Sequence, residues 1–127
     1  MILRLMRDAR GGSSVEFALV APAVLVMLFG AVGGGVLAYA TVSLQRATEV
    51  AARCMSMDRA DLCTSGTIAT YGADAYHGPH LDSLNFTATK VSCGYKIHGT
   101  GTFSAFPGLG FLSVNLNANA CYPGVRA

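Results

Sequence analysis

The stretch that decides the fold runs from Arg7 to Cys54 and reads RDARGGSSVEFALVAPAVLVMLFGAVGGGVLAYATVSLQRATEVAARC. Inside it, 29 residues from Phe17 to Gln45 carry no charged side chain. About 20 apolar residues in a helix cross the roughly 30 Å hydrocarbon core of a bilayer. The stretch therefore predicts one membrane-spanning helix. Glu16 stands directly before the uncharged span, where a simple anchor has no need of a carboxylate.

Charge and cysteine placement agree on the orientation of this helix. Arg4, Arg7 and Arg10 precede it, and an excess of basic residues marks the cytoplasmic side. All the cysteines follow it: Cys54, Cys63, Cys93 and Cys121. Disulfides persist in the periplasm or outside the cell, so two disulfides in an exported part are expected.

The disulfide pairing stays open at this stage, because four cysteines allow three pairings. We favour Cys54–Cys63, which closes a short loop at the helix end, and Cys93–Cys121, which joins two strands. Cys93 lies on the apolar phase of its strand and Cys121 on the polar phase of its own. A bulge or a strand end must therefore intervene between them.

The helix is expected to continue beyond the membrane, over residues 12–55. From Ser13 to Met55 it would measure about 65 Å at 1.5 Å per residue. One stripe is apolar: Leu44, Ala47, Ala51, Cys54 and Met55. Mostly off that stripe lie Ser43, Gln45, Arg46, Thr48, Glu49 and Arg53. Glu49 and Arg53 have the spacing of a favourable ion pair within a helix. The stripe predicts a folded head that packs on this part of the helix.

Besides a retained helix with a specialised role, the sequence allows two other interpretations. Ala38-Tyr39-Ala40 has the form of a signal-peptidase site, which would release a secreted, disulfide-linked binding domain after Ala40. The apolar run from Phe17 to Ala38 is longer than the roughly 7–15 residues of a signal-peptide core. The third interpretation is an uncut, anchored periplasmic protein.

Two segments carry a family likeness. RGGSSVEFALVAPAVLVMLFGAV (10–32) and YATVSLQRATEVAARC (39–54) resemble the TadE-like family of the tight-adherence (Tad/Flp) pilus system. The shared features are an Arg-rich leader, glycine and small residues, VEFALV, a proline (Pro22), an apolar run and an Ala-Arg element (Ala52-Arg53). The closing stretch FSAFPGLGFLSVNLNANACYP (103–123) looks like the family's last strands, and residues 56–100 are generic.

The resemblance implies a minor pilin, or pseudopilin, that a prepilin peptidase cuts at Gly11-Gly12 after a leader of residues 1–11. Glu16 corresponds to the pilin glutamate, fifth in the mature chain after a cut at Gly11 and fourth after a cut at Gly12. Such a glutamate pairs with the new α-amino group of a neighbouring subunit. Implied partners are other Tad pilins and pseudopilins, the prepilin peptidase and the inner-membrane assembly platform. The implied location is the inner membrane with a periplasmic head, and the pilus or cell surface after assembly.

Glycines interrupt the apolar span. Gly30 and Gly34 form a GxxxG pair, and Gly33 and Gly35 add bare surface. Small residues at this spacing let helices approach closely in lipid. The alternative is that the glycines only loosen the helix, since each costs up to about 1 kcal/mol in a helix interior.

Residues 56–127 predict a small α+β head. A short helix is expected over residues 67–76, with Ile68, Tyr71 and Ala75 on one face. Apolar alternation at Leu84, Phe86 and Ala88 changes phase to Val91, Cys93, Tyr95 and Ile97, which indicates a bulge near Lys90 or two strands. The fold class is therefore α+β and pilin-like: a long N-terminal helix packed on a small antiparallel sheet.

Turns and strands complete the head. Gly99-Thr100-Gly101 is expected to turn the chain before a short strand, Thr102–Phe106, and a turn at 107–110. Residues 112–122 alternate between apolar and polar side chains, which is the cleanest strand pattern in the chain.

Several function classes are not expected. A net charge of +2 gives no nucleic-acid footprint. His77-x-x-His80 is half of a metal site, but no ligand cluster has the spacing of a complete one, so neither a metal nor a cofactor is expected. No Gly-x-Ser-x-Gly motif or phosphate loop occurs in the sequence, so we do not expect an enzyme.

Overall fold

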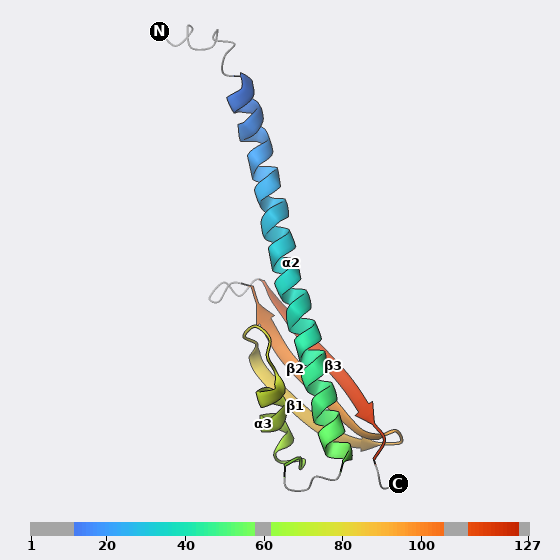
Figure 1. Ribbon diagram of the computed structural model, residues 1–127. Coiled ribbons are helices and arrows are strands. Elements are labelled where there is room, and N and C mark those ends of the chain that lie inside the picture. Colours follow the sequence, from blue (N-terminus) through green and yellow to red (C-terminus); the bar gives the residue numbers. More distant parts are fainter. Residues whose placement is uncertain (1–11, 58–61, 106–111, 125–127) are drawn as a thin grey trace. The chain divides into compact units, whose positions relative to one another are not determined.

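The computed structural model describes residues 12–57, 62–105 and 112–124, and the predicted leader of residues 1–11 lies outside them. The elements are α2 (Gly12–Ser56), α3 (Ile68–Ala75), β1 (Asp82–Val91), β2 (Gly94–Ser104) and β3 (Ser113–Tyr122) (Figure 1). The chain divides into two compact units between Gly34 and Gly35, so each unit contains part of α2. We call residues 35–127 the head unit.

Helix α2 extends over 45 residues and includes Pro22. Its last turn is closed by two bonds to the Arg53 carbonyl oxygen. The Met57 amide donates to it at 3.1 Å and the Ser56 hydroxyl at 2.8 Å. These bonds satisfy a carbonyl that would otherwise lack a partner at the end of the helix.

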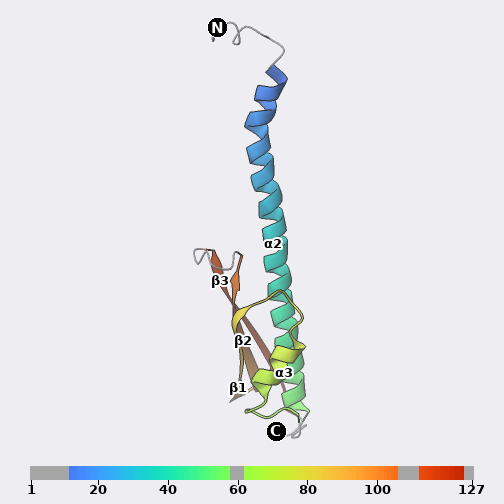
Figure 2. The same cartoon turned by 90° about the vertical axis from the view of Figure 1, so that its left-hand side faces the viewer.

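The head unit is an α+β fold, as the sequence predicts. The strands form an antiparallel sheet in the order β1-β2-β3. Helix α3 and the head-unit part of α2 cover the same face of this sheet (Figure 2). The opposite face carries no helix among the described residues.

The core lies between α2 and the sheet. Leu44, Ala47 and Ala51 are fully buried there, together with Ile97 and Phe86 of the strands. The predicted stripe on α2 is therefore confirmed. Further buried alanines are Ala40 and Ala52.

Thr48 was expected off the stripe, and that prediction is wrong, because its side chain is fully buried. Its hydroxyl donates to the carbonyl oxygen of Leu44 at 2.8 Å, which satisfies the buried polar atom within the helix. A β-carbon placed on Gly99 would lie 2.5 Å from that hydroxyl oxygen. The helix thus approaches β2 closely where the strand has no side chain.

The same approach corrects the predicted turn at Gly99-Thr100-Gly101. Strand β2 runs through these residues without a break and ends at Ser104. Gly99 faces Thr48, and a β-carbon on Gly101 would meet the Leu81 side chain at 2.9 Å. The glycines mark close packing in a strand interior rather than a turn. Phe106 and the predicted turn at 107–110 lie outside the described residues.

The phase change after Ala88 reflects two strands. Strands β1 and β2 form a hairpin that turns at Ser92-Cys93, and Gly94 has a φ of +123°, which favours glycine. A register shift occurs elsewhere, between Asp82 and Asn85. Cys93 therefore lies at a strand end, which removes the conflict of phase with Cys121.

Other predicted elements agree with the structure. Helix α3 buries Ile68 and partly buries Tyr71 and Ala75. Strand β3 buries alternate apolar residues, among them Leu116 and Ala118.

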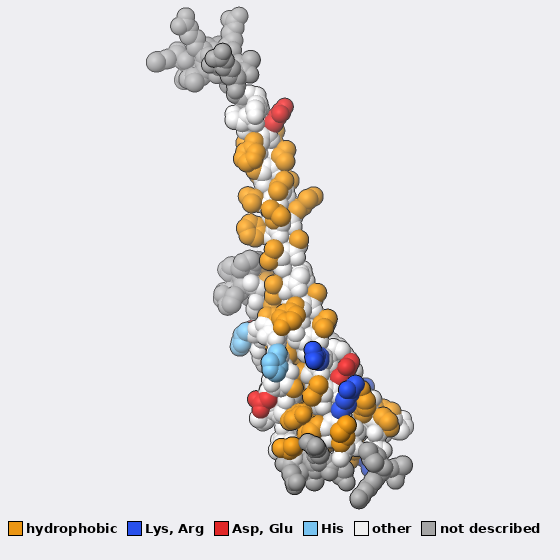
Figure 3. Space-filling view, in the orientation of Figure 1, with side chains coloured by type: hydrophobic (Ala, Val, Ile, Leu, Met, Phe, Trp, Pro, Cys, Tyr) orange, Lys and Arg blue, Asp and Glu red, His pale blue; other side chains and the backbone are white. Residues whose placement is uncertain are grey.

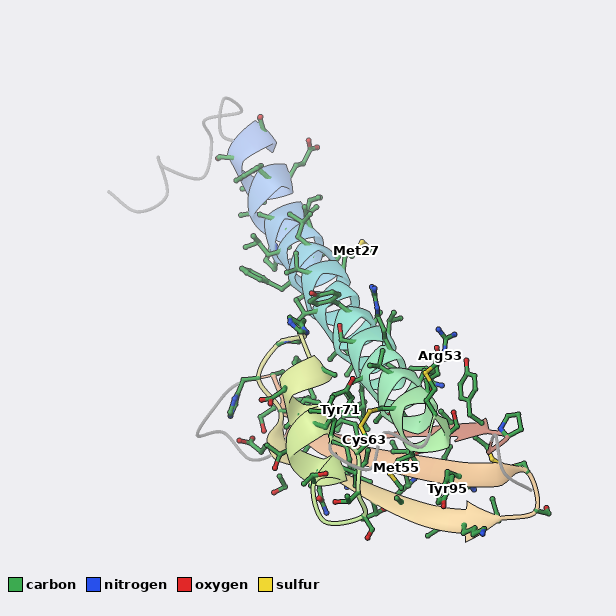
Figure 4. All side chains as sticks on the ribbon, turned by 60° about the horizontal axis from the view of Figure 1, so that its bottom comes forward. Met27, Arg53, Met55, Cys63, Tyr71 and Tyr95 are labelled. Atoms are coloured by element: carbon green, nitrogen blue, oxygen red, sulfur yellow. A yellow bond between two sulfur atoms is a disulfide. The ribbon has the colours of Figure 1, made fainter. Side chains whose placement is uncertain are left out.

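The disulfides join Cys54 to Cys63 and Cys93 to Cys121, which is the favoured pairing. The first ties the last turns of α2 to the segment before α3, and Figure 4 shows Cys63 beside this end of the helix. The second ties the β1–β2 turn to the end of β3. A small core gains much of its stability from such crosslinks.

Replacing Gly99 by alanine should destabilise the head, because the added methyl group meets Thr48 and the ring of Phe86. Overpacking of this kind costs about 1–3 kcal/mol. Denaturant unfolding of the full chain in micelles, followed by circular dichroism, measures the loss. The control is Gly66→Ala, whose β-carbon would have only one neighbour, at 3.8 Å. Equal stability of the two variants would contradict the close packing.

The two disulfides should differ in their contribution to stability. Their sequence separations are 9 and 28 residues. Loop-closure entropy then predicts losses of about 2.5 kcal/mol for Cys54→Ser/Cys63→Ser and about 3.5 kcal/mol for Cys93→Ser/Cys121→Ser. The same unfolding assay compares the two double variants. A larger loss for the shorter loop would contradict this ranking.

Candidate functional site

The first candidate site is the apolar surface of α2 from Gly12 to Gly34. Large side chains point outward along it, and Phe17 and Met27 are 74% and 76% exposed. Figure 3 shows hydrophobic side chains along the visible face of this segment. By length and composition α2 is able to cross a membrane, and none of its most apolar window is buried. One apolar N-terminal helix of this kind fits membrane anchoring.

Glu16 is the only charged residue between Gly12 and Gly34. Its side chain is exposed on α2, one turn after the first helical residue. No ion pair to Glu16 occurs among the described residues. Gly11 lies outside those residues, so the geometry of the Gly11-Gly12 bond is not described, and Gly12 begins the helix.

The glycine cluster offers bare backbone on the same helix. A β-carbon added to Gly30, Gly33, Gly34 or Gly35 would meet nothing within 4 Å. None of these glycines is therefore required for packing inside the described part of the chain. Their open surface is available to another helix or to lipid.

A second candidate surface is the outer side of α2 in the head unit. Val42 is 66% exposed, and Tyr39 and Val50 are also exposed. Two shallow hollows flank these residues, with volumes of about 520 and 660 Å³, and Arg46 lines both. The surface combines apolar contact area with a cation, which suits a protein partner.

Arg53 fastens the end of α2 to the last strand. Its Nε donates to the hydroxyl of Tyr122 at 2.7 Å, and its guanidinium carbon lies 5.1 Å from the centre of that ring. Figure 4 shows Arg53 on the helix, beside the end of the sheet. The spacing along α2 predicts an ion pair with Glu49 instead, and that prediction is wrong for the described side chains. Glu49 accepts a hydrogen bond from Gln45 at 3.3 Å.

The Arg53–Tyr122 contact is not predictable from local sequence patterns, because its partners are 69 residues apart. The sequence feature that could have indicated this contact is the Ala52-Arg53 element, because Ala52 is fully buried and the neighbouring Arg53 is exposed. The alanine lets α2 approach the sheet, and the arginine then reaches the strand end.

The loop between α3 and β1 is held against α2. Tyr39 donates its hydroxyl to the carbonyl oxygen of His77 at 2.8 Å, and Tyr76 donates to that of Pro79 at 2.7 Å. Burial raises the pKa of Tyr76, and the nearby Tyr39 raises it further. These bonds give the loop a structural role.

The histidines of this loop have separate partners. The Nδ1 of His77 lies 3.0 Å from the carbonyl oxygen of Ala75, and the Nε2 of His80 lies 3.3 Å from an Asp82 carboxylate oxygen. Over residues 12–57, 62–105 and 112–124, no group of three or more His, Cys, Asp or Glu side chains is placed to hold a metal ion.

The Arg53–Tyr122 contact is testable by a double-mutant cycle with Arg53→Gln and Tyr122→Leu. The contact is solvent-exposed, so we expect a coupling of about 0.5–1 kcal/mol. Unfolding of the wild type, the two single variants and the double variant measures it. Strictly additive losses would mean that the two side chains contribute independently.

Comparison with known proteins bears on the part of the chain that carries these features. No curated protein matches the chain, and no solved structure matches it. The family model described as TadE-like protein matches residues 11–53, from the first glycine of the predicted cleavage site to Arg53. Over this segment the chain is similar to the TadE-like family, which confirms the resemblance found in the sequence.

Proposed function

We propose that the protein is a minor pilin of a Tad/Flp-type pilus and acts by protein–protein interaction in pilus assembly and adherence. The TadE-like segment already indicates a protein related to the Tad pilus. The observation that carries the finer role is an apolar helix surface that no described residue covers and that begins next to a carboxylate. Such a surface suits lipid before assembly and neighbouring helices afterwards.

Processing fits the same role. A prepilin peptidase would cut at Gly11-Gly12, where the absence of side chains lets the backbone enter a narrow cleft in extended form. Removing residues 1–11 removes three arginines and one aspartate, so the formal net charge falls from +2 to zero. The cut also creates an α-amino group close to Glu16.

The new amino group and Glu16 would pair between neighbouring subunits. An isolated charge in a dry helix bundle is costly, and an opposite charge lowers that cost for both groups. Each such pair would then set the axial position of one helix relative to its neighbour. Gly30 and Gly34 would let the paired helices approach closely.

The proposed role implies a location and partners. Before assembly the N-terminus would be cytoplasmic, α2 would cross the inner membrane, and the disulfide-linked head would be periplasmic. The partners would be other Tad pilins and pseudopilins, the prepilin peptidase and the inner-membrane assembly platform. Pilus or cell-surface placement would follow assembly.

The structure gives no support to release of a secreted domain after Ala40. Ala40 is fully buried in the head core, and α2 is continuous through it. Leu37 packs against the same core, and Tyr39 holds the loop at His77. A cut after Ala40 would remove these contacts from the head.

Glu16→Gln tests the proposed role, because it removes the charge and keeps the shape. We expect unchanged membrane insertion but a loss of at least about tenfold in co-purification with partner pilins, since leaving one charge of a buried pair alone costs about 3–5 kcal/mol. Membrane fractionation, pull-down from native membranes and counts of pili per cell measure these effects.

The matched control is Asp74→Asn, which removes the charge of an exposed carboxylate on α3 that lines neither hollow of the outer α2 surface. This variant should assemble normally. Normal piliation of Glu16→Gln would contradict the registry role and favour an uncut anchor.

A further inference from the structure

The outer face of the sheet, which carries no helix among the described residues, has an unusual composition. On β2 the outward side chains alternate with buried ones and include Lys96, His98, Thr100 and Thr102. On β3 the outward positions include Asn115, Asn117 and Asn119. On β1 they include Asn85, Thr87 and Thr89. Amides and hydroxyls therefore dominate the middle of this face.

The strand register arranges these side chains in rows. Asn85, Thr100 and Asn117 form the central row across the three strands. Within the described chain, none of these side chains forms a hydrogen bond. The flanking rows differ: His98 lies 2.8 Å from the Asn119 side-chain oxygen.

The other flanking row is also bonded, since Thr102 donates to the Asn115 side-chain oxygen at 3.0 Å. These bonds hold the side chains on both sides of the central row in fixed positions. The central row is left with unused donors and acceptors.

A shallow hollow lies over this part of the face. Its volume is about 320 Å³, and its lining includes Ser83, His98, Thr100, Thr102, Asn115 and Asn117. This is near the small end of the range of about 300–1,000 Å³ that is usual for ligand sites. Ser83 has a φ of 54°, a left-handed conformation that is uncommon outside glycine. The hollow is thus formed by the register shift at Asp82–Asn85 and the faces of β2 and β3.

Strand β3 carries asparagines that neither strand formation nor core packing requires. Asparagine is depleted in strands, whereas threonine or valine would favour this conformation. Three asparagines at successive outward positions lower strand propensity where no core contact requires them. Residues whose propensity disfavours the secondary structure that contains them are typical of functional surfaces.

The chemistry of the hollow selects a class of ligand. Its lining carries no Lys, Arg, Asp or Glu, and Lys96 and Asp82 belong to rows on opposite sides. An ionic ligand therefore has no counter-charge there. The core of a protein interface needs exposed aromatic or large apolar side chains, and the only large apolar residue in this lining, Leu116, is buried. A neutral ligand with many hydroxyl groups matches amides and hydroxyls, since each of these groups both donates and accepts.

We propose that the hollow lined by Thr100 and Asn117, beside Asn85 of the central row, binds a neutral glycan. Asn117 and Thr100 would form hydrogen bonds to the sugar hydroxyls, with the flanking rows as the rim. No Phe, Tyr or Trp lines the hollow, so a single site would bind weakly, in the millimolar range, and repeated copies would raise the avidity. This site is independent of the pilus role, because it uses no residue of α2.

The test uses the full chain in lipid nanodiscs, since glycoside detergents carry a neutral sugar themselves. The probes are maltohexaose, cellohexaose, laminarihexaose, mannohexaose and the hexamer of N-acetylglucosamine, with oligogalacturonate as the charged comparison. Saturation-transfer NMR detects binding, and titration gives the affinity. We expect at least one neutral probe to bind, and to bind about tenfold more weakly to Thr100→Val/Asn117→Val, which loses two hydrogen bonds.

Thr89→Val is the matched control, because Thr89 is outward on β1 but outside the hollow, and this variant should bind normally. Valine favours strands, so the double variant should fold, and its melting temperature checks this. If it does not fold, Asn117→Thr replaces it, with an expected weakening of about threefold, because only one amide contact is lost. The proposal is overturned if no neutral probe binds at its highest soluble concentration or if the hollow variants bind normally. Two further results would overturn it. One is tighter binding of oligogalacturonate than of any neutral probe. The other is a dimer of the chain that forms without sugar and that the hollow variants no longer form.

Discussion

One constraint dominates this protein: within the described part of the chain, the large apolar side chains of α2 between Phe17 and Val36 are exposed. Apolar surface left in water costs about 25 cal/mol per Å². Lipid or other helices must therefore cover this segment. The pattern of α2 changes in the head unit, where alanines and Leu44 become the core. A single helix thus has an outward apolar segment that requires partners and an inward stripe that organises a small domain.

The head depends on how closely that stripe approaches the sheet. Small side chains on α2 and the bare backbone of Gly99 bring helix and strand together, and Thr48 is buried at the contact with its hydroxyl satisfied. Arg53 and the disulfides then fix the ends of the elements. Because the helix covers only one face, the other face is left for polar side chains, and it is there that the central row around Thr100 has unused hydrogen-bonding groups.

Much of this fold is predictable because it follows local periodicity. The long helix, helix α3 and strand β3 each show the repeat of their own secondary structure, and charge with cysteine placement favours an exported head. The turn predicted at Gly99 and Gly101 was wrong, because glycine occurs both in turns and where two elements pack closely. Only the residues that lie next to it in space distinguish the two cases. Thr48 and the Arg53–Tyr122 contact were missed because they depend on pairs far apart in the sequence. The role of Glu16 stays a prediction, because its proposed partner belongs to another subunit.

The proposed pilin role depends on where the mature protein begins. The most direct measurement is the intact mass and N-terminal sequence of the protein isolated from its native membranes. The pilin role predicts a chain that begins at Gly12 or Ser13, with Glu16 close to a free α-amino group. A chain that begins at Thr41 would mean a secreted domain, and one that keeps Met1 would mean an uncut anchor. Either of these results would contradict the pilin role.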